Sequence, residues 1–114
     1  WQPDRDAFLA QKLRAAGAII LGKTNLSEWA NYMDAKMPNG FSTLGGQTRN
    51  PYGPYDTLGS SSGSAVAAAA NFAAATVGSE TQGSLIAPAG INSVVALKPS
   101  LGLVSRDYVI PLLD

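Results

Sequence analysis

Two serine-containing turns hold the residues whose types and spacing could do chemistry. Ser60 lies in the run G-S-S-S-G-S at residues 59–64, and Ser84 ends the run G-S-E-T-Q-G-S at residues 78–84. Between the turns the pattern predicts a helix and then a short strand. Packing a helix against the strand that follows it brings the start of the helix near the end of the strand. We therefore expect Ser60 and Ser84 to lie close together in space.

The second turn has the pattern of an oxyanion hole beside a nucleophile. Turns between a strand and a helix point several backbone N–H groups into one concavity, and here these amides belong to Thr81, Gln82, Gly83 and Ser84. The Ser84 hydroxyl could attack a carbonyl bound there, with Ser60 as the proton carrier. A serine nucleophile needs a base, and in a chain without histidine that base would be a desolvated, neutral lysine.

The same residues also have structural interpretations. Ser84 precedes an expected helix and could cap it, Ser61 could be a hydrogen-bonding support, and Ser62 could cap the alanine-rich helix. Residues 59–63 match the G-x-S-x-G elbow with Ser61 as nucleophile, but that elbow follows a strand and needs a histidine. Residues 17–24 match a phosphate loop, yet their variable positions are themselves an expected strand, so nucleotide binding is disfavoured.

The composition narrows the function further. The 114 residues carry no net charge, and 14% are charged while 46% are hydrophobic. No basic patch of a nucleic-acid-binding surface and no apolar run of roughly 18–20 residues for a membrane span is present in the sequence. Without histidine or cysteine, a Ser-His-Asp triad, thiol catalysis and His- or Cys-ligated metal are excluded within these residues. So low a charged fraction is typical of the interior of a larger protein, and we expect this chain to be part of one.

Helices alternating with apolar strands favour an α/β architecture with a largely parallel sheet, incomplete in this chain. The second predicted helix begins with a capping box of Asn25 and Glu28. The predicted helices are 4–16, 26–32, 63–75 and 85–92. The predicted strands are 18–21, 76–80 and 93–97, with short extended pieces at 101–104 and 109–112. Residues 33–58 lack periodicity, which is typical of a functional loop.

Five sequence blocks, in order, resemble the amidase signature family, most closely its branch of peptide amidases and related bacterial, fungal and plant amidases. The most specific blocks are the two serine turns, which stand at the spacing of the family. The others are G-K-T-N-L-S-E-W at 22–29, G-G-Q-T-R-N-P-Y at 45–52 and L-K-P at 97–99. The resemblance implies that residues 1–114 are the N-terminal to central portion of a single amidase signature domain.

The resemblance implies an amide hydrolase that cleaves small-molecule or peptide amides through a serine acyl-enzyme, with a Ser–cisSer–Lys triad and no cofactor. On the matching positions Ser84 is the nucleophile and Ser60 is the bridging serine, preceded by a cis peptide bond. Ser61 is a supporting residue. The amides of residues 81–84 form the oxyanion hole.

The lysine of the implied triad falls before the first residue of this chain, so the remainder of the domain is required for activity. Lys23 and Lys98 match other blocks of the family, and each is expected to be a strand-end lysine with a hydrogen-bonded head. Two positions depart from the family. Gln82 stands where many members carry a small or acidic residue, and Asp107–Tyr108 stand where glycine is common.

Two other functions stay open. An A-type subunit of an amidotransferase in the same family would supply ammonia to a charged tRNA and would need partner chains. A catalytically inactive fragment would lack the base lysine. An upstream lysine in the full-length chain favours the enzyme, and a co-purifying partner subunit favours the amidotransferase. The sequence assigns no compartment and no oligomeric state.

Overall fold

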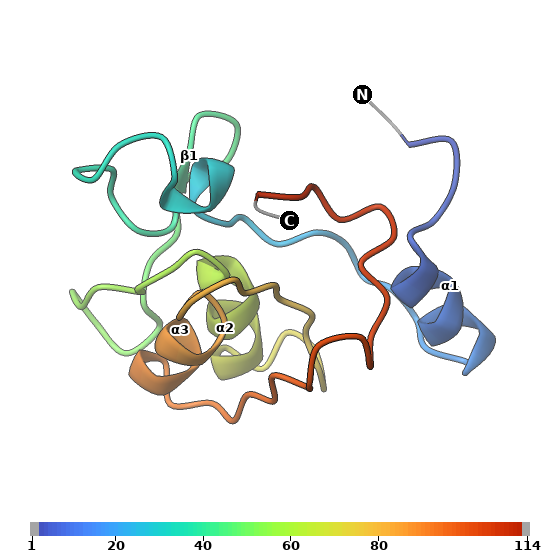
Figure 1. The fold of residues 1–114 in the computed structure, drawn as a ribbon. Helices are drawn as coiled ribbons and strands as arrows, with labels where there is room; N and C mark the ends of the chain where they lie inside the picture. The colour runs from blue at the N-terminus through green and yellow to red at the C-terminus, as the bar shows by residue number, and fades with distance from the viewer. Residues whose placement is uncertain (1–2, 113–114) are drawn as a thin grey trace. The chain divides into compact units, whose positions relative to one another are not determined.

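The computed structural model describes residues 3–112, which divide into two compact units. The first unit contains residues 3–22 and 99–112, and the second contains residues 23–98. The second unit carries both serine turns. The elements in chain order are α1 (Phe8–Ala15), the 3-10 turn η1 (Glu28–Asn31), β1 (Phe41–Ser42), β2 (Gly46–Gln47), α2 (Ser62–Ala69) and α3 (Ile86–Ile91) (Figure 1).

The first unit combines helix α1 with a C-terminal segment held by charged side chains. The Arg5 guanidinium donates to both carboxylate oxygens of Asp107, at 2.7 and 2.9 Å, and stacks 4.0 Å from the centre of the Tyr108 ring. The Tyr108 hydroxyl donates to Asp4. Tyr108 has a left-handed φ of +65°, so this position, in the pair where the family often has glycine, needs the conformation that glycine adopts most easily.

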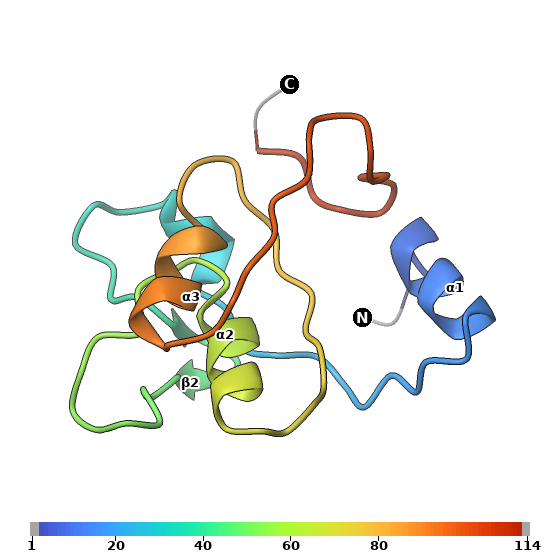
Figure 2. The same cartoon turned by 90° about the horizontal axis from the view of Figure 1, so that it is seen from below.

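Helices α2 and α3 pack side by side in the second unit, as both views show (Figures 1 and 2). The prediction of α3 is confirmed with bounds one residue shorter at each end, and Pro88 lies in its first turn. Helix α2 begins near the predicted position but ends at Ala69, six residues early. Because this segment is apolar nearly all round, its sequence predicts a buried helix, but only the first turn is buried.

The predicted parallel strands are not formed within residues 3–112. The sheet of this part of the chain is one antiparallel ladder, in which Phe41 pairs with Gln47 and Ser42 with Gly46. Residues 76–80 and 93–97 have no strand assignment, because a strand exists only where a second backbone supplies its hydrogen bonds. Several of their apolar side chains are exposed, with Val95 and Leu97 at 100% and 82%.

The helix predicted for residues 26–32 is also wrong. Trp29, Ala30 and Asn31 have φ values of +47°, +56° and +63°, so η1 is a left-handed turn rather than an α-helix. Asn25 and Glu28 form no capping box, since both side chains bind the loop that follows. The Glu28 carboxylate accepts the Thr43 hydroxyl at 2.8 Å.

Asn25 holds the irregular stretch 33–58 to the rest of the second unit. Its amide nitrogen donates to the Gly40 and Gly46 carbonyls at 3.2 and 2.9 Å and to the Thr48 hydroxyl at 3.0 Å. Its amide oxygen accepts the Ser42 hydroxyl at 2.6 Å. One partly buried side chain therefore fixes both ends of the β1–β2 hairpin.

The centre of the second unit is polar rather than apolar. The buried hydrophobic residues described here are Ala65 and Ala89, whereas the buried polar residues are Ser27, Asn50, Thr57, Ser60, Ser61, Ser62, Ser64 and Asn92. Small hydroxyl side chains allow close approach of backbones but must be hydrogen-bonded when buried. The packing around the first serine turn therefore depends on hydrogen-bond pairing more than on apolar area.

This close approach predicts the effect of one added methyl group. A Cβ on Gly63 of α2 would overlap the carbonyl oxygen of Asn25 and lie 2.8 Å from its backbone nitrogen. Because backbone atoms cannot turn aside, we expect Gly63→Ala to lower the free energy of unfolding of the full-length protein by about 1–3 kcal/mol.

The matched control is Gly90→Ala in α3, where a Cβ meets nothing within 4 Å. Alanine there reduces the entropy of the unfolded chain, so this variant should be about 0.4–1 kcal/mol more stable. Denaturant unfolding of the two variants and the wild type measures both effects. Equal stability of the two variants would contradict the packing described for α2.

Candidate active site

The first serine turn is enclosed on the side of Gly59. The Gly59–Ser60 peptide bond is cis, as the resemblance implied. A Cβ on Gly59 would overlap the Ser27 hydroxyl and lie 2.8 Å from the Asn31 side-chain oxygen. The Ser60 carbonyl accepts the Ser27 amide at 2.9 Å, and Ser60 is 4% exposed. Position 59 therefore requires glycine, and the backbone of Ser60 is anchored.

The two serine turns meet through Ser61. Its amide donates to the Ser84 carbonyl at 2.9 Å. Its hydroxyl donates to the Ser79 carbonyl at 2.9 Å and accepts the Ser79 amide at 3.0 Å. Ser60 thus lies one residue from a direct bond to Ser84. The expectation that the turns come together is confirmed, although they do so by bonds between turns rather than by a helix packed on a sheet strand.

The hydroxyl groups of the first turn divide into two kinds. Ser61, Ser62 and Ser64 each use the hydroxyl to hold backbone: Ser62 donates to the Leu58 carbonyl, and Ser64 donates to the Val77 carbonyl at 2.7 Å. Ser62 is the first residue of α2 and makes no cap, so that interpretation of Ser62 is wrong. Within residues 3–112, by contrast, the Ser60 hydroxyl makes no hydrogen bond.

The Ser84 hydroxyl, like that of Ser60, makes no hydrogen bond within residues 3–112. It therefore does not cap α3. The cap position belongs to Leu85, so the interpretation of Ser84 as a helix cap is wrong. The amides of Thr81, Gln82 and Ser84 likewise have no acceptor in the described part of the chain. The turn therefore presents donors and a hydroxyl that its own fold does not use.

Glu80 takes the capping role that the sequence suggested for Ser84. One carboxylate oxygen accepts the Leu85 and Ile86 amides at 2.8 and 2.9 Å, and the other accepts the Lys98 ammonium at 2.9 Å. Burial raises the pKa of Glu80, but the hydrogen bonds from Ile86, Lys98 and Leu85 outweigh it and hold the pKa at about 2. Sequence reasoning missed this residue, because a cap four or more residues away in a turn has no local signature.

The two lysines that match family blocks have ordinary structural surroundings. The Lys98 ammonium also donates to the Thr81 carbonyl at 3.0 Å, so its head is hydrogen-bonded as expected. Lys23 is exposed. Within residues 3–112, no hydrogen bond joins either lysine to Ser60, and the Lys23 head has no hydrogen-bond partner, unlike the expectation for it.

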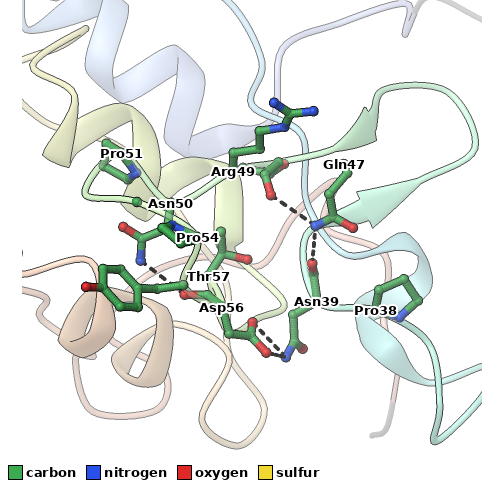
Figure 3. A pocket seen from close by; sticks show the side chains of 12 residues that line it. Pro38, Asn39, Gln47, Arg49, Asn50, Pro51, Pro54, Asp56 and Thr57 are labelled. Carbon is green, nitrogen blue, oxygen red and sulfur yellow. Dashed lines mark hydrogen bonds between the residues drawn. The ribbon is translucent and has the colours of Figure 1, made fainter.

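A hollow of about 820 Å³ lies over the loop of residues 38–57 and not at the serine turns (Figure 3). In it the Asn39 amide donates to the Asp56 carboxylate at 3.2 Å, and the Gln47 amide donates to the Asn39 carbonyl at 2.7 Å. Its lining consists of polar loop residues, prolines and Tyr55.

Two further findings concern the described residues alone. They contain no group of three or more histidine, cysteine, aspartate or glutamate side chains placed to hold a metal ion. None of their helices has the length and apolar character needed to cross a membrane.

Comparison with known proteins decides the family. The family model named Amidase matches residues 1–113. The chain belongs to the amidase family. A probable amidase of Arabidopsis thaliana is 50% identical over 109 residues, which are 95% of this chain and 21% of that protein. The A subunit of the glutamyl-tRNA(Gln) amidotransferase of Alkaliphilus metalliredigens is 49% identical over 105 residues, 91% of this chain and 20% of that protein.

Two solved amidase structures superpose closely on the chain. The peptide amidase of Stenotrophomonas maltophilia is 60% identical, with a TM-score of 0.91 over 93% of this chain and 22% of that structure. An amidase family protein of Bacillus anthracis is 56% identical, with a TM-score of 0.96 over 98% of this chain and 23% of that structure. The chain thus spans about a fifth of the length of these relatives. This likeness to amidases is consistent with the predicted α/β class, although the described residues hold two short strands and three α-helices.

The two hydrogen bonds between the Ser61 hydroxyl and the Ser79 backbone lead to a prediction about stability. Removing the hydroxyl in Ser61→Ala leaves the amide and the carbonyl of Ser79 without their partner, so we expect the full-length protein to lose about 1–3 kcal/mol of stability. Ser100→Ala, at an exposed position, should change stability by less than about 0.5 kcal/mol. Thermal unfolding compares the two, and an unchanged melting temperature for Ser61→Ala would refute the supporting role.

The low pKa of Glu80 predicts a dependence of stability on pH. The pKa falls from 4.5 to about 2 on folding, so the ionised group stabilises the protein above about pH 4.5 and this contribution is lost as pH falls toward 2. Glu80→Gln has no such group, so the stability difference between wild type and variant should shrink on acidification. Unfolding titrations at several pH values measure it, and a difference that stays constant would show that Glu80 is not held ionised.

Proposed function

We propose that the full-length protein is a serine amidase that hydrolyses carboxamides through an acyl-enzyme on Ser84. One observation carries the proposal. Within the adjoining serine turns, the hydroxyls of Ser60 and Ser84 make no hydrogen bond in the described fold, nor does that of the exposed Ser79, whereas Ser61, Ser62 and Ser64 bind backbone groups with theirs. Membership of the amidase family supports the same chemistry.

In the proposed reaction the Ser84 oxygen attacks the carbonyl carbon of the amide, and its proton passes to Ser60. Ser60 gives its own proton to a neutral lysine. The negative charge that develops on the carbonyl oxygen is held by backbone N–H groups from residues 81–84. Collapse of the tetrahedral intermediate breaks the C–N bond, and the amine or ammonia leaves with a proton returned through the same relay.

Water then attacks the ester of Ser84 by the reverse relay, and the carboxylic acid is released with the serine restored. The lysine of this scheme lies outside residues 1–114, as does the rest of the domain that completes the site. Among the amides, that of Gly83 is one of the groups that lower the pKa of the Glu80 carboxyl, so it lies near that carboxylate. The amides of Thr81, Gln82 and Ser84 are therefore the stronger candidates for the oxyanion.

The proposed substrates are small-molecule or peptide amides. The support is the likeness to structures described as peptide amidase, one of them in complex with the competitive inhibitor chymostatin. The second candidate function is an amidotransferase A-type subunit, which is favoured by relatives of that name at 43–49% identity. An enzyme of the first kind should act alone on peptide amides and be inhibited by chymostatin, whereas a subunit should need partner chains and prefer glutamine.

The nucleophile is tested with a fluorophosphonate on the full-length protein. We expect a single adduct on Ser84, and Ser84→Ala should lose both the adduct and about 10³-fold or more of the amidase rate. Intact mass and peptide mass spectrometry locate the adduct, and ammonia release measures the rate.

Ser79→Ala is the matched control, because Ser79 lies in the same turn with an exposed side chain. This variant should keep the adduct and most of the rate. An adduct on Ser61 would overturn the assignment of roles, and a full-length protein with neither adduct nor hydrolysis would favour the inactive alternative.

A further inference from the structure

We propose that Glu80 and Lys98 are positioning residues that orient the peptide groups of the turn carrying Ser84. The proposal rests on the proposed function. Both residues belong to the second unit, and neither is placed in contact with substrate. Their role is to decide which way the N–H groups of this turn point.

Glu80 fixes the end of the turn that leads into α3. Its side chain is only 8% exposed, and one oxygen accepts the Leu85 and Ile86 amides at 2.8 and 2.9 Å. These amides begin a short helix and have no acceptor within it. Because these two N–H groups point to the Glu80 carboxylate, they do not point to the side of the turn where the oxyanion is proposed to lie.

Lys98 holds the other end of the turn, at Thr81. Its ammonium donates to the Thr81 carbonyl at 3.0 Å while it pairs with Glu80 at 2.9 Å. In a trans peptide group the C=O and N–H bonds point in opposite directions. Holding the Thr81 carbonyl toward Lys98 therefore points the N–H of Gln82 away from it, on the side left open by the fold.

The middle of the turn is held by the two helices. The Gly83 carbonyl accepts the Ala87 amide at 2.8 Å, so the Ser84 N–H points back out of α3. The Ser84 carbonyl accepts the Ser61 amide at 2.9 Å, so the Leu85 N–H points the opposite way, to Glu80. Three peptide groups of one short turn are thus oriented by named contacts, and two of these contacts end on the Glu80–Lys98 pair.

The pair also has an electrostatic consequence. A lone buried carboxylate next to a developing oxyanion would oppose its negative charge. The ammonium of Lys98 lies against that carboxylate and offsets it. Removing Lys98 alone should therefore slow acylation more than removing both charges.

The experiment uses the full-length protein with four variants: Lys98→Met, Lys98→Arg, Glu80→Gln and the double variant Glu80→Gln/Lys98→Met. We expect Lys98→Met to slow the fluorophosphonate reaction of Ser84 and kcat by about 10- to 100-fold, with KM little changed, because the turn is misplaced rather than the substrate site. The double variant should lose less of the rate than Lys98→Met does. Lys98→Arg should keep most of the wild-type rate, since its guanidinium can donate to both acceptors.

Hydrogen exchange of the segment around residues 80–87, followed by mass spectrometry, reads the geometry without any activity. Exchange of the Leu85 and Ile86 amides should quicken in Glu80→Gln. If it does not, the anchoring by Glu80 is refuted. If Lys98→Met loses no rate, or the double variant is slower than Lys98→Met, the positioning role of the pair is refuted. A wild type that reacts with no fluorophosphonate refutes the proposed function instead, and the exchange result still decides the Glu80 contact.

Discussion

The hydrogen bond from the Ser61 amide to the Ser84 carbonyl is the constraint on which the candidate site depends. It joins two residues that lie 23 positions apart along the chain, one in each turn. The Ser61 hydroxyl strengthens the same junction through Ser79. On the first side the Ser27 amide holds the Ser60 carbonyl, and on the second Glu80 holds the start of α3. Without the central bond the hydroxyls of Ser60 and Ser84 would belong to unrelated loops.

Hydrogen bonds from buried polar side chains to the backbone, rather than a large apolar core, hold the second unit together. Its buried side chains are mainly hydroxyls and amides that bind backbone groups of other segments. Such contacts are directional, so they fix the orientation of peptide groups as well as their separation. Large apolar side chains, including those of Val95 and Leu97, lie instead on the outside of the described residues. In the longer amidases that this chain resembles, we propose that the remainder of the domain covers these faces.

Local sequence patterns correctly predicted helices α1 and α3, because a helix forms its hydrogen bonds within one stretch of the chain. The helices predicted at residues 4–16 and 85–92 are present as α1 and α3, with bounds that agree within four residues. The strands failed because a ladder needs a second backbone, which no run of apolar residues supplies. The helix at residues 26–32 failed because Asn25 and Glu28 bind the hairpin instead of capping, and three left-handed residues follow.

The sequence by itself determined the family, the two serine turns and the absence of histidine and cysteine from this stretch, because motifs and composition are properties of order along the chain. Only the tertiary structure decided which serines keep a hydroxyl unused, since the partners of Ser61 and Ser64 stand 18 and 13 residues away. It alone placed Glu80 at the start of α3 and paired it with Lys98, 18 residues on. The physical reason is that a hydrogen bond depends on distance and direction in space, and loops of this length leave both unspecified until the fold forms.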